Sequence, residues 1–255
     1  MKLLIDLGNT RLKWALWNGT ELHPGGAVVH AGNVPVDFAA LWKDVQNVDA
    51  VFVASVAGRA LEDGLAHHLR DRFGVEPRFP VSVTAACGVR NAYAQPERLG
   101  VDRFLGLIAA HAQHRQPTVI AGCGTALTLD ALATDGRHLG GLIAPSPALM
   151  RAALRGNTAR LAVNDEAQVV EVADNTADAI ESGTRLAGVA LIERFVAQSA
   201  KHFDVVPALI LTGGGAQGLA ELITLPHRIE ADLVLRGLVR FVEHGPGAPS
   251  ASTLG

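Results

Sequence analysis

The chain has 255 residues, of which 49% are hydrophobic and 18% are charged, and its formal net charge at pH 7 is -3. This length allows one large domain or two of moderate size, and the small net charge gives no reason to expect nucleic-acid binding. No uninterrupted apolar run is long enough to span a bilayer, and no signal segment precedes the first predicted strand. The two cysteines, Cys87 and Cys123, form no disulfide framework. We therefore expect a soluble, cytoplasmic protein.

The N-terminal stretch predicts a strand, a tight turn and a returning strand. Leu3–Ile5 is a short apolar run typical of a buried strand, and Asp6 places a carboxylate near its end. Gly8–Thr10 supplies a glycine and two short polar side chains, and the apolar pattern resumes over Leu12–Trp17. Such a turn can cradle phosphate through its backbone amides, and Asp6 can reach Mg²⁺ directly or through water. The alternative is an ordinary hairpin in which these polar residues serve only the turn.

The rest of the first half predicts alternating strands and helices, as in an α/β domain. Gly25-Gly26 is predicted as a turn before the next strand. The predicted elements are a strand at 27–30, a helix at 37–45, a strand at 49–56, a helix at 61–73 closed by Gly74, and a long loop at 84–96. Long loops of this kind often carry function.

Asp102 and Arg103 open an apolar, alanine-rich helix predicted over 104–112. The plain interpretation is an acid favoured by the helix dipole beside a surface cation. However, Gly100 permits close approach of a ligand, and the helix is too apolar to be a solvated surface helix. We therefore expect its polar start to face a cleft.

The second half repeats the opening. A strand at 118–121, a glycine turn at 122–125 and a returning strand at 126–130 have the same order as the N-terminal hairpin. Further elements follow: a strand at 138–145, helices at 148–155 and 177–196 (the second capped by Asp174–Thr176), a strand at 207–212 running into Gly213–Gly215, and a closing segment at 229–242. The repeat predicts a duplicated α/β fold with nucleotide between its halves: domains at 1–115 and 116–244, and a disordered tail at 245–255.

Several segments then resemble a known family. Asp6–Thr10, Gly100–Arg103, Gly124–Ala126, Gly140–Ile143 and Asn175–Thr176 occur in the order found in type III pantothenate kinases, and the resemblance extends from Met1 to about Val242. It implies two duplicated ribonuclease-H-like domains, as in actin-like ATPases, with a nucleotide cleft between them. It also implies a homodimer that uses ATP and Mg²⁺ to phosphorylate pantothenate to 4'-phosphopantothenate, the first step of coenzyme A synthesis.

The resemblance assigns roles residue by residue. The ATP phosphates would contact Asp6, Leu7, Gly8, Asn9, Thr10, Arg11, Leu12, Lys13 and Thr125, with Asp6 associated with Mg²⁺. Pantothenate would contact Tyr93, Gly100, Val101, Asp102, Arg103 and, across the dimer, Thr176. Asp102 resembles the catalytic proton acceptor, and a carboxylate suits that role in phosphoryl transfer. For Lys13 the alternative is a solvated residue on a strand edge.

Two positions depart from the family pattern. Gly122 stands where many members have an aspartate that helps to bind a monovalent cation, so we expect activity to depend little on K⁺ or NH₄⁺. Ser146 stands where the family usually has glycine. The alternative function is a non-catalytic, ATP-binding accessory or regulatory protein on the same scaffold. Such a regulator should have lost Asp6 or Asp102, and this chain keeps both.

Overall fold

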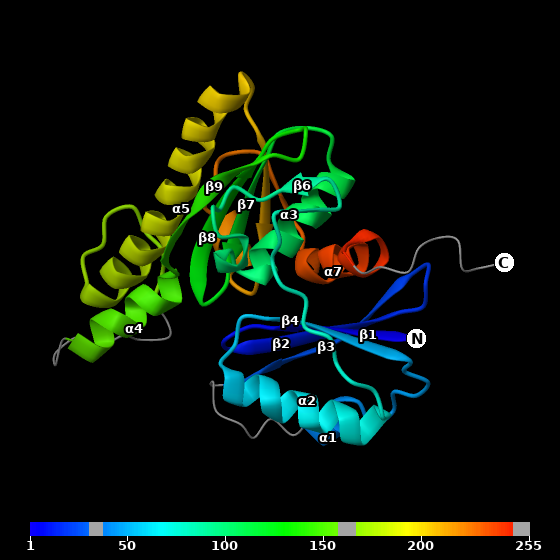
Figure 1. The fold of residues 1–255 in the computed structure, drawn as a ribbon. Helices are drawn as coiled ribbons and strands as arrows, with labels where there is room; N and C mark the ends of the chain where they lie inside the picture. The colour runs from blue at the N-terminus through cyan, green and yellow to red at the C-terminus, as the bar shows by residue number, and fades with distance from the viewer. Residues whose placement is uncertain (31–37, 158–166, 247–255) are drawn as a thin grey trace. The chain divides into compact units, whose positions relative to one another are not determined.

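The computed structural model describes residues 1–30, 38–157 and 167–246 of the chain, and it contains two compact units. The first unit comprises Met1–Gln113, Asp135–Arg137 and Asp232–Gly255, and the second comprises His114–Thr134 and His138–Ala231. Each unit combines a mixed sheet with helices, so the predicted α/β class is confirmed (Figure 1). Residue 37 of a predicted helix and residues 247–255 of the predicted tail lie outside the described residues.

The first unit is built on a four-stranded sheet in the order β3-β2-β1-β4. The strands are β1 (Lys2–Leu7), β2 (Arg11–Trp17), β3 (Leu22–Val29) and β4 (Ala50–Ser55). The first three form an antiparallel meander, and β4 runs parallel to β1. The predicted turn at Gly25-Gly26 is wrong, because both glycines lie inside β3. A Cβ at Gly25 would lie 2.1 Å from the ring of Trp14, so glycine lets that indole lie against the strand.

Alternation along β1 divides its side chains between the two faces of the sheet. Leu3, Ile5 and Leu7 belong to one hydrophobic core, which also contains residues of α1 (Phe38–Leu41) and α2 (Arg59–Phe73). Asp6 therefore projects from the opposite face of the strand. Helix α2 ends as predicted at Gly74, which adopts the left-handed conformation with φ 67° and donates its N–H to the carbonyl of Arg70.

Helices α3 (Val101–Gln113) and α7 (Leu233–His244) pack against each other within the first unit. Their backbones approach so closely that a Cβ at Gly237 would lie 1.9 Å from the carbonyl oxygen of Leu105. Residues 233–244 were predicted to belong to the second domain (116–244), whereas α7 belongs to the first unit, where it packs on α3. Between β4 and α3 lie the short elements β5 (Ala85–Ala86), β6 (Val89–Arg90) and η1 (Pro96–Arg98).

The second unit contains a five-stranded sheet in the order β11-β10-β7-β8-β9. Its strands are β7 (Thr118–Cys123), β8 (Ala126–Leu132), β9 (His138–Pro145), β10 (Ala208–Thr212) and β11 (His227–Ile229). Strands β7, β8 and β9 form an antiparallel meander, and β10 runs parallel to β7. This order repeats β1, β2, β3 and β4, with β11 added at the edge, so the duplication inferred from the two hairpins is present in the topology.

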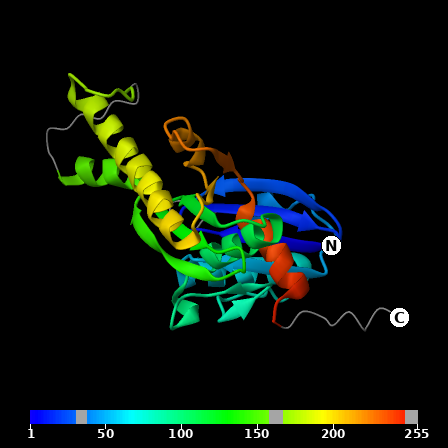
Figure 2. The same ribbon diagram turned by 90° about the horizontal axis from the view of Figure 1, so that it is seen from above.

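Helices cover the second sheet. The core contains apolar residues of β7, β8 and β10 together with residues of α5 (Thr176–Phe203) and α6 (Ala216–Ala220). Helix α4 (Pro147–Asn157) lies beside α5 (Figure 2). Asn175 caps α5 as predicted, but the helix continues beyond residue 196 to Phe203. Ser146 is buried, and its hydroxyl accepts the N–H of Leu149 at the start of α4. No helix among the described residues is both long and apolar enough to cross a membrane.

Candidate active site

The connection between β1 and β2 is a tight reversal at the C-terminal end of β1. The N–H of Gly8 donates to the carbonyl of Arg11 over 3.0 Å, and a Cβ at Gly8 would lie 3.2 Å from that oxygen. The close approach of the Arg11 carbonyl oxygen to the backbone of residue 8 therefore favours glycine at this position. Asn9–Thr10 form the exposed tip, whereas the side chains of Leu7 and Leu12 are fully buried. These two leucines can offer a phosphate only their backbone.

Asp6 lies near two charged groups, Lys13 of the same predicted hairpin and Asp102 of the separate Gly100–Arg103 segment. It is the cross-strand partner of Lys13 in the ladder between β1 and β2. Burial of its carboxyl group and, second, the negative charge of Asp102 raise the pKa of Asp6 to about 7, while Lys13 acts to lower it. The first unit thus brings together Asp6, Lys13 and Asp102, three of the predicted site residues.

The pair of neighbouring carboxylates fits a divalent cation. Magnesium takes oxygen ligands and usually binds through one or two carboxylates, waters and phosphate oxygens. Burial and, second, the negative charge of Asp102 make an ionised Asp6 unfavourable in the folded chain, and a bound divalent cation would offset that cost. Within the described part of the chain no three acidic, histidine or cysteine side chains are grouped to hold a metal. The donor set therefore suits Mg²⁺ held by Asp6, directly or through water, with substrate phosphate completing the shell.

Arg103 and Tyr93 form the second part of the site in the first unit. The Arg103 side chain is mostly buried and donates from Nη1 to the Tyr93 hydroxyl over 3.2 Å, with Cζ 5.8 Å from the ring centroid. Its backbone N–H donates to Oδ1 of Asp102 over 2.8 Å. A Cβ at Gly100 would lie 2.6 Å from that Oδ1, so glycine makes room for the carboxylate at the helix start. Val101 is buried and can offer only its backbone.

The loop that carries Tyr93 is fastened at Arg90. The N–H of Arg90 donates to the carbonyl of Gly136 over 2.9 Å, and its guanidinium pairs with Asp135 at 2.7 Å. Gly88 and Gly136 both adopt positive φ, and a Cβ at Gly136 would lie 1.9 Å from the Gly88 carbonyl oxygen. These contacts hold the loop through residues distant in sequence, which explains how a segment without periodicity has a defined shape.

In the second unit, the turn between β7 and β8 meets the glycine-rich loop after β10. The N–H of Gly124 closes the turn by donating to the carbonyl of Ala126 over 3.0 Å, which leaves Thr125 exposed at the tip. The N–H of Gly215 donates to the carbonyl of Cys123 over 2.9 Å. Gly213 has φ 93°, and a Cβ there would lie 2.6 Å from the same oxygen. The two glycine-bearing segments thus share one end of the parallel strands, where α/β sheets bind ligands.

Gly122 faces Thr128 across the ladder between β7 and β8. A Cβ at Gly122 would lie 2.5 Å from Oγ1 of Thr128. The threonine hydroxyl therefore occupies the space that a side chain at residue 122 would need. It is a neutral oxygen, so this position lacks the negative charge that an aspartate would provide.

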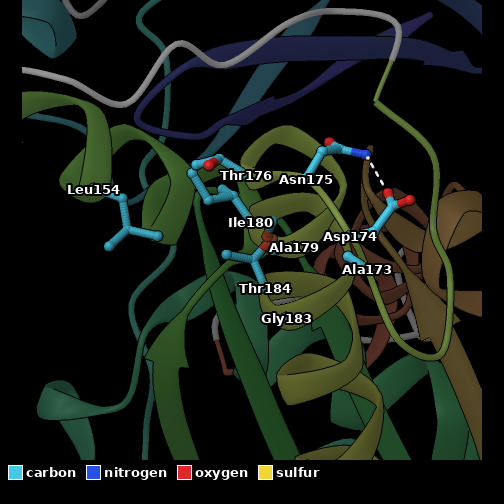
Figure 3. Close-up of a pocket in the computed structure, with 9 residues that line it drawn as sticks. All are labelled: Leu154, Ala173, Asp174, Asn175, Thr176, Ala179, Ile180, Gly183 and Thr184. Carbon is cyan, nitrogen blue, oxygen red and sulfur yellow. Dashed lines mark hydrogen bonds between the residues drawn. The ribbon is translucent and has the colours of Figure 1, made fainter.

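Thr176 is the first residue of α5 and is exposed. It lines a cavity of about 510 Å³ to which α4, α5 and the segment 173–175 contribute (Figure 3). The helix start is held by Asn175, whose side chain accepts the N–H of Asp178 and donates to Asp174. Thr176 belongs to the second unit, whereas the other predicted pantothenate contacts belong to the first.

The residues that hold these segments in place were not predicted from the sequence. His30 bonds to the turn at Gly8, and its only sequence signal is a polar residue at the end of an apolar strand. No sequence signal indicated that Asp135 pairs with Arg90 or that the hydroxyl of Thr128 lies against Gly122, because these partners lie far along the chain or across a strand. Local sequence patterns predicted the candidate reactive side chains. The residues that hold those side chains in position became apparent only from tertiary contacts.

The chain is similar to proteins of one family over most of its length. A family model described as type III pantothenate kinase matches residues 2–198. A type III pantothenate kinase from Nitrosococcus oceani is 37% identical over 249 residues, covering 94% of this chain and 93% of the relative. The enzyme of that name from Xanthomonas campestris pv. campestris (strain 8004) is 42% identical over 242 residues, covering 94% and 97%.

Solved structures show the same fold at lower identity. A proposed 2-dehydro-3-deoxygalactonokinase from Sinorhizobium meliloti has a TM-score of 0.60 at 14% identity, covering 95% of this chain and 98% of that one. A proposed Baf family transcriptional activator from Campylobacter jejuni has a TM-score of 0.58 at 21% identity, covering 94% and 97%. These two likenesses concern the fold alone. The family-model match and the sequence relatives together show that the chain belongs to the type III pantothenate kinase family.

Proposed function

We propose that the chain transfers the terminal phosphoryl group of ATP to pantothenate, giving ADP and 4'-phosphopantothenate in the first step of coenzyme A synthesis. The observation that carries the proposal is the grouping of Asp6, Lys13 and Asp102 at the end of β1. It occurs in a chain that belongs to the type III pantothenate kinase family. The same grouping argues against the alternative of a non-catalytic regulator, which would have no need of two neighbouring carboxylates.

The chemistry requires positioning and charge stabilisation more than covalent catalysis. Asp102 accepts the proton of the pantothenate hydroxyl while that oxygen bonds to the γ-phosphorus, and the bond from phosphorus to the bridging oxygen of ADP breaks. Asp6 would hold Mg²⁺, which when bound offsets negative charge on the phosphates. The backbone of Leu7–Leu12 would orient the phosphates through its N–H groups, and Lys13 would add a positive charge on the same side.

Pantothenate binding would use the segment around Arg103. Pantothenate carries a carboxylate, and a guanidinium held by Tyr93 is a planar donor suited to a carboxylate or to its neighbouring oxygens. Gly100 and Val101 would contribute backbone atoms beside Asp102. Because the N–H of Arg103 donates to Asp102, binding and proton acceptance would be linked through adjacent residues of α3.

Nucleotide binding would also involve the second unit. Thr125 at the exposed turn would contact the nucleotide through its hydroxyl and the backbone beside it. The loop Gly213–Gly215 lies against this turn and lacks side chains, so an adenosine could approach its backbone closely. Gly122 lies opposite the neutral hydroxyl of Thr128 and supplies no carboxylate. This supports our expectation that the reaction depends on Mg²⁺ and depends little on K⁺ or NH₄⁺. Both cysteines are free, which suits the reducing cytoplasm as the place of action.

The proposal includes a homodimer in which Thr176 contacts the partner's pantothenate. Large apolar side chains are exposed on β9, α4 and α5, and α4 contacts both of the other elements: Leu142, Ile143, Leu149, Leu154 and Leu186. Leu142 and Ile143 are consecutive on β9 and point to opposite faces of the strand, and Ile143 is the more exposed of the two. Burying exposed apolar side chains against a second copy is favourable. We expect Ile143→Asp to produce monomers in sedimentation equilibrium. The matched control, Ile229→Asp, changes a residue exposed on β11 of the same unit and should remain dimeric. A fully active wild-type monomer at assay concentration would contradict the dimer.

The deciding experiment is an ATP- and Mg²⁺-dependent phosphorylation assay with pantothenate against acetate and a panel of sugars. The product should be 4'-phosphopantothenate, formed in amounts equal to the ADP released. Phosphorylation of a sugar in preference to pantothenate would show that the protein is a kinase of the same fold with a different acceptor, and would contradict the proposal. ATP binding without phosphorylation of any acceptor would favour the regulatory alternative.

A further inference from the structure

We infer that His30 is a positioning residue for the ATP-phosphate turn, an inference that rests on the proposed function of that turn. His30 directly follows β3, which pairs with β2. Its side chain is buried, with a relative exposure of 4%. Its Nε2 lies 3.0 Å from the carbonyl oxygen of Gly8, and its backbone N–H donates to the carbonyl of Thr10 over 2.8 Å. One residue therefore binds two carbonyl groups of the same turn.

The chemistry of the contact fixes the proton on the ring. A carbonyl oxygen only accepts hydrogen bonds, so Nε2 of His30 must carry the hydrogen. Both groups that His30 presents to the turn are thus N–H donors, one from the ring to Gly8 and one from the backbone to Thr10. His30 therefore holds the turn at two alternate residues, Gly8 and Thr10, by hydrogen bonds to their carbonyl groups.

Fixing these carbonyls also fixes the direction of N–H groups in the turn. The peptide bonds here are trans and planar, so the N–H of each peptide points away from its own carbonyl oxygen. With the carbonyl of Gly8 held toward His30, the N–H of Asn9 points away from the ring, and the N–H of Arg11 is directed in the same manner by Thr10. A rotated peptide would turn a carbonyl oxygen toward phosphate, which would repel it, whereas N–H groups attract it.

A space-filling role does not account for a histidine at this place. The other ring nitrogen, Nδ1, is buried and has no hydrogen-bond partner among the residues that the structure describes. Burying an unsatisfied polar atom is unfavourable, so an apolar side chain would fill the same volume at lower cost. The bond from Nε2 to Gly8 is the feature that an apolar residue could not reproduce.

The test compares His30→Gln with His30→Met in the full-length protein. Glutamine can place an amide N–H where Nε2 lies, whereas methionine has similar length and no donor. Binding of Mg²⁺–ATP is measured by calorimetry, which needs no acceptor, and KM is measured separately for ATP and pantothenate. We expect His30→Met to weaken ATP binding about 3- to 10-fold, the usual worth of one hydrogen bond. His30→Gln should stay within about 2-fold of wild type, with the KM for pantothenate unchanged in both.

Two results would overturn the inference: equal ATP affinity in wild type and His30→Met, or equal losses in the glutamine and methionine variants. If His30→Met fails to fold, His30→Asn replaces it, since its amide is one methylene too short to reach Gly8 and its polarity matches glutamine. The proposed function is judged apart, by whether wild type phosphorylates pantothenate. A difference between the variants in ATP affinity would support the positioning role even if pantothenate were not the acceptor.

Discussion

Replacing Asp6 by asparagine should stabilise the metal-free protein at neutral and alkaline pH while abolishing its use of Mg²⁺–ATP. In the folded chain, burial and Asp102 raise the pKa of Asp6 from an ordinary 3.8 to about 7. Above pH 7 the folded protein must therefore hold an ionised Asp6 where the charge is unfavourable. The unfolded chain ionises the same group in water without that cost. An asparagine side chain carries no charge, so Asp6→Asn removes the penalty.

The sign and size of the expected change in the free energy of unfolding follow from proton linkage. A raised pKa in the folded state contributes stability that is full below pH 4 and is lost as the pH rises to about 7. The difference between the two pKa values corresponds to ~4 kcal/mol of folding free energy at 1.36 kcal/mol per pKa unit. Asp6 keeps some contact with solvent, which screens part of the effect, so we expect a gain on the order of 2 kcal/mol at pH 8. The gain should shrink toward pH 5.

The measurement is urea unfolding in EDTA from pH 5 to 8, followed by tryptophan fluorescence. All three tryptophans, Trp14, Trp17 and Trp42, belong to the first unit that contains Asp6. Added Mg²⁺ should stabilise wild type more than Asp6→Asn. The control is Asp135→Asn in the same unit, where hydrogen bonds from the backbone of Arg137 and from Arg90 hold the pKa of Asp135 below its ordinary value.

Asp135 contributes stability above its unfolded pKa that is lost in acid, so Asp135→Asn should act in the opposite direction and lower stability at pH 8. An Asp6→Asn variant no more stable than wild type at pH 8 would refute the reasoning. So would a gain that stays constant between pH 5 and pH 8, because that gain would not come from ionisation.

Three further predictions concern turnover, cations and packing. Asp102→Asn should keep the fold and lower turnover by roughly two to four orders of magnitude, the usual worth of a general base; near-normal steady-state rates would remove Asp102 from that role. Initial rates should rise little when K⁺ or NH₄⁺ replaces Na⁺ at constant ionic strength, because Gly122 offers no carboxylate; large, saturable activation would show that another group supplies the ligand. Gly237→Ala should lower the free energy of unfolding by about 1–3 kcal/mol, because its Cβ would lie 1.9 Å from the Leu105 carbonyl oxygen. Gly106→Ala, whose Cβ would meet only a side-chain atom at 3.7 Å, is the matched control, and equal unfolding midpoints for the two variants would contradict the packing argument.

The hairpins and helix starts were predictable because their signals are local. The apolar run Leu3–Ile5 predicts a buried strand with Asp6 near its end, and the polar series Asp174–Thr176 predicts the start of the helix that follows it. Gly25 misled the prediction, since glycine commonly marks a turn, while here it makes room for the ring of Trp14. The end of α5 was also missed: its last turns contain no glycine or proline, and the left-handed cap falls on Asp204.

The supports of the candidate site were not predictable, because each depends on a contact between distant residues. Nothing near Arg90 indicates that it pairs with Asp135, and nothing near His30 indicates a bond to Gly8. The family resemblance assigned Asp6 and Asp102 separate roles, and no local pattern indicated that the two side chains lie near each other. Sequence patterns identify groups able to react, and the fold decides which of them meet.

The placement of α7 has a consequence for synthesis on the ribosome. The first unit draws on three separate stretches of chain, and the last of them, Asp232–Gly255, is translated after the whole second unit ends at Ala231. Until α7 emerges, the side of α3 at Leu105 lacks the helix that covers it in the finished protein. Domains commonly fold in the order of their synthesis. Here, however, the second unit is fully synthesised before the first unit, whose last segment begins at Asp232. The N-terminal hairpin with Asp6, which α7 contacts, is therefore the part of the chain whose surroundings are completed last. A nascent chain stopped before residue 233 would contain the hairpin without the helix that completes its unit.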